Sequence, residues 1–148
     1  MNRPDPQPML KIHVIPVTPF AQNCSIIMCT QTNAAAVVDP GGDVDAIMQA
    51  ARQMNANVEQ SLLTHGHLDH ATGAPALAAA LQSATGHVVP IIGPHSADQY
   101  WLDDLPARAR AYGFGEAKAF TPTRYLQDGD EVQIGAQRLQ TLHCPGHT

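Results

Sequence analysis

The stretch THGHLDH, residues 64–70, holds three histidines and one aspartate within six consecutive positions. In an extended segment, residues two apart project to the same side, so His65 and His67 can address one metal ion. Asp69 and His70, one turn further on, can face a second position nearby. Imidazole nitrogens suit zinc, and a mixed set of imidazole and carboxylate ligands also suits iron or manganese. The spacing therefore predicts a centre for one or two metal ions.

A third ligand for the first metal is expected from HCPGHT, residues 143–148. A catalytic zinc takes three protein ligands and leaves one position for water. His147 is the expected supplier, because Pro145 and Gly146 turn the backbone so that its ring points back at the metal. His143 is expected to belong to the preceding strand and to have no ligand role.

Several of these residues have simpler interpretations. Asp69 can be a helix cap. Asp39 is either a turn residue or an acceptor that holds a ligand histidine from behind, and the sequence does not decide between them. Cys144 is expected to be a small buried hydrophobic residue, with Cys24 and Cys29 in the core. Three other histidines are expected to be structural or solvated: His13, His87 and His95.

Composition narrows the class of protein. With 148 residues and 44% hydrophobic content, the chain suits one domain with a real core, and its 14% of charged residues argues against disorder. A net charge of -5 disfavours a nucleic-acid partner, and no apolar run is long enough for a membrane helix. The first residues, MNRPDPQP, lack a signal-peptide pattern, so we expect a frayed tail over residues 1–10 and a cytoplasmic protein. Three cysteines without a CxxC spacing fit the same reducing compartment.

Alternation of strand and helix patterns predicts an α/β protein. Helices are expected after Asp43, which can cap the first one, at 74–84, and at 96–113 with a break at Pro106. The expected strands are 11–17, 24–30, 34–40, 58–64, 87–93, a short strand within 125–134, and 135–144. Leu62 and Leu63 are apolar together, as in a strand that is buried on both faces. The histidine cluster is therefore expected in the loop after a buried strand.

Three segments together resemble the metallo-β-lactamase superfamily: VVDPGG, LLTHGHLDH and LHCPGHT. Within it, the chain looks most like the short bacterial glyoxalase II-like (hydroxyacylglutathione hydrolase-like) enzymes, and the likeness extends from Lys11 to Thr148. The resemblance implies a four-layer αββα sandwich with the metals at one rim. It implies that His65, His67 and His147 hold the first metal, and that Asp69 and His70 belong to the second. The family's other second-site ligands follow the GHT motif, so residues 11–148 are expected to be an incomplete domain that lacks its C-terminal part.

The resemblance also implies an activity, the hydrolysis of a small thioester such as S-lactoylglutathione to lactate and glutathione. Zinc lowers the pKa of bound water from about 15.7 to about 7, which provides a hydroxide nucleophile. Asp69 would orient that hydroxide and accept its proton. Rival activities on the same scaffold are an iron-dependent sulfur dioxygenase, a lactonase, a β-lactamase and a nuclease, the last disfavoured by the acidic charge. A different class is a non-catalytic metal-binding fragment that needs its missing C-terminal part, and a soluble monomer without turnover would favour it. Because the missing part would leave apolar faces open, we expect the 148-residue chain made alone to be insoluble, partly unfolded or dimeric.

Overall fold

A computed structural model describes residues 8–148 of the chain. The predicted N-terminal tail, residues 1–10, lies mostly outside that range. Its last residue, Leu10, already belongs to the first strand of the structure.

Five strands form one mixed sheet in the order β1-β2-β3-β4-β5. The first three strands pair antiparallel, whereas β3, β4 and β5 pair parallel. Their bounds are β1 Leu10–Val17, β2 Gln22–Cys29, β3 Ala34–Val38, β4 Asn57–Leu62 and β5 Ile91–Ile92. The α/β class predicted from the sequence is confirmed.

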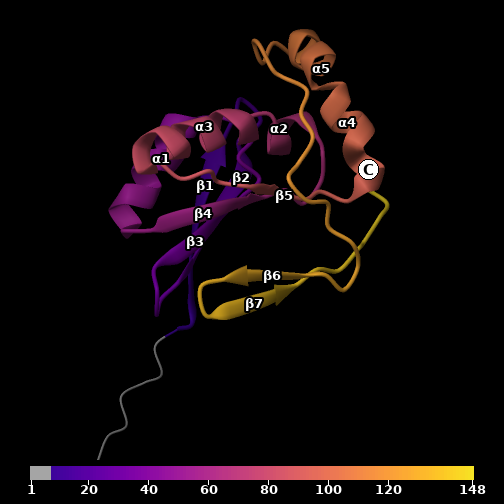
Figure 1. The fold of residues 1–148 in the computed structure, drawn as a ribbon. Helices are drawn as coiled ribbons and strands as arrows, with labels where there is room; N and C mark the ends of the chain where they lie inside the picture. The colour runs from indigo at the N-terminus through magenta and orange to yellow at the C-terminus, as the bar shows by residue number, and fades with distance from the viewer. Residues whose placement is uncertain (1–7) are drawn as a thin grey trace, which may run out of the picture.

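Helices cover one face of this sheet, and a two-stranded hairpin covers the other (Figure 1). The helical layer contains α1 Val44–Met54, α2 Leu68–Ala71 and α3 Ala74–Thr85. The hairpin is formed by β6 Glu131–Ile134 and β7 Gln137–Gln140. Between them in sequence come η1 Ser96–Asp98, α4 Gln99–Asp103 and α5 Leu105–Tyr112, and the C-terminus lies beside α4 (Figure 1). Of the four predicted layers, the fourth stays a prediction.

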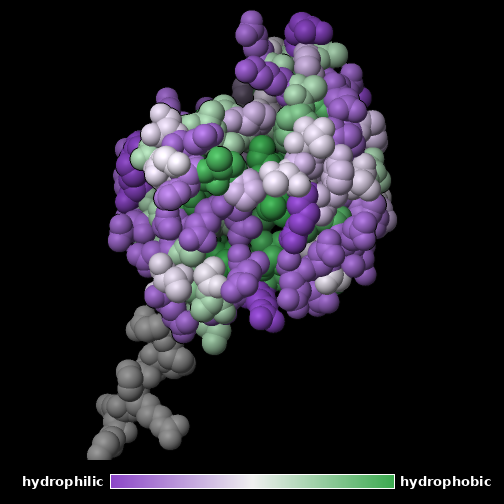
Figure 2. Space-filling view, viewed as in Figure 1, coloured by the Kyte–Doolittle hydropathy of each residue, from purple (hydrophilic) through white to green (hydrophobic). Residues whose placement is uncertain are grey.

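The core is divided by the sheet. One cluster, with Ile26, Val37 and Ile47 fully buried, packs the sheet against α1 and α3. Another, with Val132 and Ile134, packs the sheet against the hairpin. Leu62 belongs to the hairpin side and Leu63 to the helix side, so the predicted burial of this strand on both faces is confirmed. Hydrophobic side chains are visible in the middle of one face, between the helical layer and the hairpin, with hydrophilic ones around them (Figure 2).

Strand β4 contains a bulge at Glu59. Val58 pairs with Ala35, but the next residue of β3, Ala36, pairs with Gln60. Val58 therefore packs against the helices, while the Gln60 side chain donates to the main-chain oxygen of Gln133 in the hairpin, at 2.7 Å. Residues two apart in a regular strand share a face, and the extra residue breaks that rule here.

The remaining strand predictions are partly wrong. Of the strand predicted at 87–93, only Ile91 and Ile92 pair with β4, and Val88 is 77% exposed. Pro90 has no N–H to donate, so it can bond to β4 only through its carbonyl oxygen, which accepts from the Ser61 N–H at 3.0 Å. Of the strand predicted at 135–144, only Gln137–Gln140 is formed, although the main chain of Thr141 still bonds Gly129 and Asp130 across the hairpin.

The structure confirms the predicted break between helices at Pro106 and corrects the predicted role of Asp43. The break at Pro106 is confirmed, because α4 ends at Asp103 and the proline lies in the first turn of α5. Asp43 does precede α1, but it does not cap it through its side chain. Asp43 Oδ2 instead accepts a hydrogen bond from the Thr18 N–H at 2.8 Å, which ties α1 to the turn after β1. None of the helices within residues 8–148 combines the length and hydrophobicity that crossing a bilayer requires.

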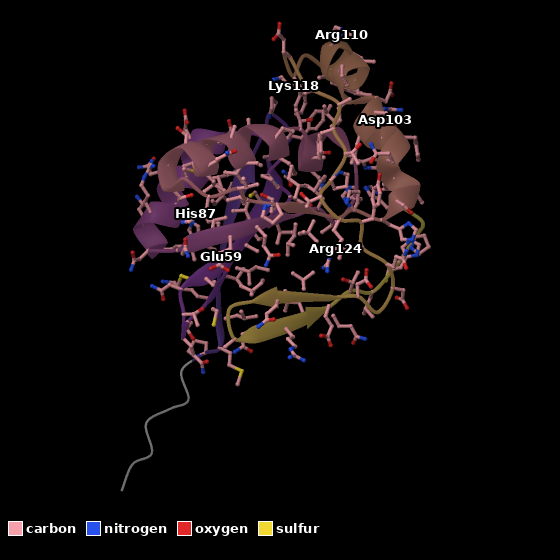
Figure 3. The ribbon with its side chains drawn as sticks, in the orientation of Figure 1. Glu59, His87, Asp103, Arg110, Lys118 and Arg124 are labelled. Atoms are coloured by element: carbon pink, nitrogen blue, oxygen red, sulfur yellow. The ribbon has the colours of Figure 1, made fainter. Side chains whose placement is uncertain are left out.

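One side chain links the sheet edge to the hairpin. Arg124 lies between the two layers (Figure 3), where its backbone bridges to Ile92 of β5. Its Nη2 donates to the Glu131 carbonyl oxygen of β6 at 3.1 Å. This contact helps to hold the hairpin over the carboxyl half of the parallel strands.

Candidate metal centre

The predicted site residues come together at one edge of the sheet. Asp39 directly follows β3, and the histidine loop, residues 64–70, directly follows β4. The two strands run parallel, so their carboxyl ends open on the same rim, where ligands bind in such sheets. The C-terminal segment carries His147 to this rim, past the end of the hairpin.

Three imidazoles converge there. One nitrogen each of His65, His67 and His147 lies within 4.8 Å of the other two. The ring centroids are 4.7 to 5.0 Å apart, and the ring planes are 71 to 80° from one another. Rings that meet edge to face at this distance can aim nitrogen atoms at one point. We call these three residues the imidazole group.

His65 offers a test of whether a metal ion fits the imidazole group. Its Nδ1 lies 2.8 Å from the Thr64 hydroxyl, and that hydroxyl donates to Asp39 Oδ2 at 2.6 Å. The hydroxyl has a single proton, so Nδ1 of His65 must be the donor in the first contact. Nε2 therefore keeps its electron pair, and it is buried without a partner among the described residues. A buried, unpaired imidazole electron pair beside two other imidazoles suits a metal ligand.

Asp39 supports two of the histidines. It is 5% exposed, and its Oδ2 also accepts a hydrogen bond from His70 Nδ1 at 2.9 Å. Its Oδ1 accepts from the Thr64 N–H at 2.8 Å. The structure thus places Asp39 as an acceptor behind His70 directly and behind His65 through Thr64. The other ring nitrogen of His70, Nε2, lies 3.6 Å from Asp69 Oδ2. Asp39, His70 and Asp69 form what we call the carboxylate group.

Asp69 does not cap a helix. The short helix α2 starts at Leu68, its N-cap residue is His67, and no side chain caps it. Asp69 lies in the first turn with its carboxylate beside His70. The helix-cap interpretation is therefore wrong.

The glycine pair after Asp39 sets the distance between the two loops. A Cβ atom on Gly41 would collide with the main-chain carbonyl of Asp69. Only glycine allows backbones to approach this closely. The loop after β3 therefore packs onto the backbone of the histidine loop and holds Asp39 within reach of His70.

Burial and neighbouring charges move the pKa values of the histidines in different directions. Burial, and then the neighbouring His70, lower the pKa of His65 to about 4. Burial and then His147 also lower the pKa of His67. Burial acts the same way on His70, but its hydrogen bond to Asp39 and the charges of Asp39 and Asp69 outweigh it and raise the pKa. At neutral pH, His65 and His67 are therefore neutral and have electron pairs to donate.

A cavity of about 440 Å³ opens beside the imidazole group. His65, His147 and Thr64 contribute to its polar end. The rest runs between the five-stranded sheet and the hairpin and is lined mainly by apolar side chains, among them Val38, Leu62, Leu126, Val132 and Leu139. This volume falls within the range of small-molecule sites.

The other histidines and Cys144 lie outside the two groups. His143 is in the loop beyond β7, not in the strand as predicted, and its ring stacks on His95 at 4.2 Å. Cys24 and Cys29 are buried as predicted, but Cys144 is exposed, because little of the described chain packs over residues 142–148. His13 and His87 are exposed, and His95 Nδ1 accepts from the Ala97 N–H at the start of η1, as expected of solvated or structural histidines.

Sequence reasoning missed Thr64. Its hydroxyl links Asp39 to His65 and thereby decides which nitrogen of His65 is free. The available signal was a hydroxyl residue directly before the first histidine of the cluster. A threonine at the end of a strand is too common to mark such a role without coordinates.

Comparison with known proteins points to one protein family. The family model described as the metallo-beta-lactamase superfamily matches residues 17–148. Hydroxyacylglutathione hydrolase GloC of Haemophilus influenzae is 37% identical over 140 residues, which are 94% of this chain and 63% of that protein.

Two solved structures have a fold similar to that of this chain. The crystal structure of BLEG-1 B3 metallo-beta-lactamase matches with a TM-score of 0.74 and 26% identity, covering 93% of this chain and 63% of the other. TTHA1623 in a di-iron-bound form matches with a TM-score of 0.73 and 25% identity, over 92% and 62% of the two chains. The chain thus spans a little under two thirds of the length of these relatives. The fold, the histidine-rich rim and the match over residues 17–148 show that this chain belongs to the metallo-β-lactamase superfamily.

Proposed function

We propose that this chain is part of a metal-dependent thioester hydrolase that converts a small glutathione conjugate, such as S-lactoylglutathione, to lactate and glutathione. The observation that carries the proposal is the convergence of His65, His67 and His147 with the free Nε2 of His65 buried between them. The similarity to a hydroxyacylglutathione hydrolase supports the choice of substrate class.

The two groups would hold two metal ions, zinc or iron. We assign His65, His67 and His147 to the first ion. Asp69 and His70 are assigned to the second, with Asp39 behind His70. Asp39 Oδ2 already accepts two hydrogen bonds, which favours a supporting role over direct coordination. A bound zinc ion supplies an activated water molecule and polarises the thioester carbonyl.

Each residue then has a defined task. Thr64 and Asp39 keep the hydrogen of His65 on Nδ1, away from the metal side. Asp69 orients the attacking water and accepts its proton. The water oxygen bonds to the acyl carbon, the carbon–sulfur bond breaks, and the sulfur leaves as thiolate. A thiolate is a good leaving group, so no side chain is needed to protonate the sulfur as the bond breaks, and solvent protonates it afterwards.

The architecture of the whole domain, its cellular location and its class of partner are also part of the proposal. We infer a four-layer αββα domain, of which residues 11–148 form the helical layer, the first sheet and the first hairpin of the second sheet. The three free cysteines support a cytoplasmic location. The substrate would be a small molecule, and the net charge of -5 argues against a nucleic-acid partner.

The direct test is thiol release from S-lactoylglutathione by metal-loaded protein, measured with a chromogenic thiol reagent. Asp69→Ala should lower turnover by at least about a hundredfold, which is what a positioned acid–base group contributes. The comparison variant is Cys144→Ser, at an exposed residue near His147, which should change turnover only mildly. Full turnover by Asp69→Ala, or hydrolysis of β-lactams but not of thioesters, would overturn the proposal.

An iron enzyme is the second candidate, because one of the similar structures is described as a di-iron-bound form. Metal analysis of the protein as purified distinguishes the two. Iron, together with oxygen consumption on a glutathione persulfide, would favour the sulfur dioxygenase. Zinc, together with thiol release, would favour the hydrolase.

A further inference from the structure

We propose that Asp98, Trp101 and Arg108 form a clamp that positions His65 and His67 for metal binding. The three residues belong to η1, α4 and α5, outside both groups of the candidate metal centre. This inference rests on the metal-binding part of the proposed function. It concerns how the two ligands from one loop are held in place.

Asp98 fixes the backbone between the two histidines. Its side chain is buried, with 7% of the residue exposed, and its Oδ2 accepts a hydrogen bond from the Gly66 N–H at 2.9 Å. This bond joins residues 32 positions apart in the sequence. A buried hydrogen bond to a charged group is stronger than one between neutral groups, and it would leave a costly unpaired carboxylate if broken.

Gly66 allows η1 and α4 to pack directly on the histidine loop. A Cβ atom at this position would lie 2.9 Å from the Trp101 Cβ and 3.1 Å from the Asp98 carbonyl oxygen. Neither neighbour is the flexible end of a side chain, so no space exists for a larger residue. The backbone between His65 and His67 is therefore confined by contact as well as by the hydrogen bond.

Trp101 confines the ring of His67. The two rings meet edge to face, with centroids 4.6 Å apart and planes at 87°. Such aromatic contacts favour one relative orientation over others. This contact therefore favours the orientation in which the His67 ring also faces His65 and His147.

Arg108 holds Trp101 in turn. Its guanidinium carbon lies 4.1 Å from the centroid of the Trp101 ring, a cation–π distance. Its Nε lies 2.8 Å from Asp104 Oδ2, one helical turn earlier in the sequence. The contacts thus run without a break from an ion pair on α5 to a proposed metal ligand.

Metal binding requires that the ligand side chains be held accurately in place. Metal–ligand distances are set to within about 0.2 Å, so two ligands from one loop must be placed more accurately than a free loop allows. Asp98 acts on the main chain between the ligands, and Trp101 acts on one ligand ring. Neither residue touches the metal position in this interpretation, and both are positioning residues.

The first experiment measures zinc affinity by competition with a chelator. Asp98→Ala should weaken binding by about 10- to 100-fold, the usual effect of losing a partner that orients a ligand. Asp98→Asn keeps an acceptor for the Gly66 N–H and should restore affinity to within a few-fold of the parent. Melting of the metal-free forms shows whether each variant folds. Equal affinity in all three forms, or an equal loss in both variants, would overturn the hydrogen-bond part of the clamp.

The second experiment uses the fact that Trp101 is the sole tryptophan of the chain. Cobalt quenches tryptophan fluorescence at short range, so the first equivalent of Co²⁺ should quench Trp101, and His67→Ala should abolish that phase. For zinc affinity, Trp101→Phe should stay near the parent while Trp101→Ala loses about tenfold. Tyr112→Ala removes an exposed aromatic ring of α5 and should change neither measurement.

A double variant tests whether the clamp acts as one unit. Residues that support the same ligands couple, so Asp98→Ala with Trp101→Ala should lose less affinity than the product of the two single losses. Independent, multiplying losses would overturn the clamp as a unit. A parent protein that binds no metal at all would overturn the metal proposal, and the clamp with it. Metal binding that none of the clamp variants weakens would overturn the clamp alone.

Discussion

Two neighbouring groups of side chains at one rim are built in opposite ways. The imidazole group has three histidines and no carboxylate among its members, whereas in the carboxylate group one histidine lies between two aspartates. The centroids of His65 and His70 are only 4.1 Å apart, yet the pKa of His65 is lowered and that of His70 is raised. Distance to the rim is therefore not what decides basicity here. Burial lowers the pKa of both rings, and only at His70 do the hydrogen bond to Asp39 and the charges of Asp39 and Asp69 outweigh it.

This difference matters for metal binding. The imidazole group presents neutral donors at neutral pH, and all three proposed ligands lie within residues 8–148. The carboxylate group supplies negative charge but only one imidazole. We therefore expect the two groups to respond differently to the same kind of change.

The largest expected effect comes from removing one imidazole of either group. His147→Ala should weaken binding of the first zinc ion by at least about a hundredfold, since even indirect partners of a ligand are worth 10- to 100-fold. His70→Ala should leave the first ion bound and release only the second. Metal content after dialysis against a weak chelator measures both. A greater loss of the first ion in His70→Ala than in His147→Ala would show that the two groups are wrongly divided.

Asp39 belongs to the carboxylate group and also supports His65 of the imidazole group through Thr64, so changing it should affect both groups. Asp39→Asn should weaken metal binding about 10- to 100-fold and should lower the pKa of His70, because the charge that raises this pKa is lost. Chelator competition and a proton NMR titration of the metal-free protein measure the two effects. Asp43→Asn is a matched control, because Asp43 is also an aspartate at positive φ whose carboxylate accepts a main-chain hydrogen bond. Equal effects of the two substitutions would contradict the shared role.

Thr64 should affect the imidazole group alone. Thr64→Val removes the acceptor for His65 Nδ1 and should weaken the first metal about tenfold, while Thr64→Ser keeps the hydroxyl and should bind as the parent does. Nitrogen NMR of His65 gives an independent readout, since the valine variant should show a mixture of the two ring tautomers. A serine variant as weak as the valine variant would contradict the hydroxyl relay.

The sequence could predict those parts of the candidate metal centre that depend on residues close together in the chain. The spacing of His65, His67, Asp69 and His70 lies within one turn of chain, and the sequence alone predicted that these residues would lie close together. His147 required a turn at Pro145 and Gly146, which is also a local signal. The division of labour between Asp39, Thr64 and the two histidines depends on three segments meeting in space, and no periodicity encodes it.

The wrong predictions about the fold also arose where the outcome depends on contacts between distant segments. Residues 87–90 and 141–144 have strand-like composition, but a strand needs continuous main-chain bonds to a neighbouring strand. Pro90 lacks the N–H for such a bond, and beyond Thr141 the His143 N–H donates to the Asp128 side chain instead of to a main-chain carbonyl. Cys144 was expected to be buried because cysteine usually is. Its exposure depends on what packs over the last residues, which their own sequence does not show.

The smallest expected effect concerns acid stability of the metal-free protein. His65 has a pKa of about 4 in the folded state and about 6.5 when unfolded, so between these values the unfolded chain binds more protons. The contribution of neutral His65 is therefore present above about pH 6.5 and is lost as the pH falls through about 4. His70 has a raised pKa, so its contribution is present below about pH 6.5 and is lost as the pH rises through its folded-state pKa.

Urea unfolding at a series of pH values checks this difference. His65→Ala should flatten the loss of stability between about pH 6.5 and 4. His70→Ala should flatten the loss at higher pH and leave the acid limb in place. Parallel curves for the two variants would mean that the two rings do not differ in the way the hydrogen bonds suggest.

The bulge in β4 has a consequence for the whole rim. Along a strand, the side on which a residue points depends only on whether its position is odd or even, and one extra residue exchanges the two sides from there on. Glu59 is that extra residue, and it lies toward the end of the sheet away from the C-terminus (Figure 3). It decides whether Leu62 or Leu63 faces the hairpin. A deletion of Glu59 would change no proposed ligand, yet it would exchange the faces of the residues that lead the chain into the histidine loop.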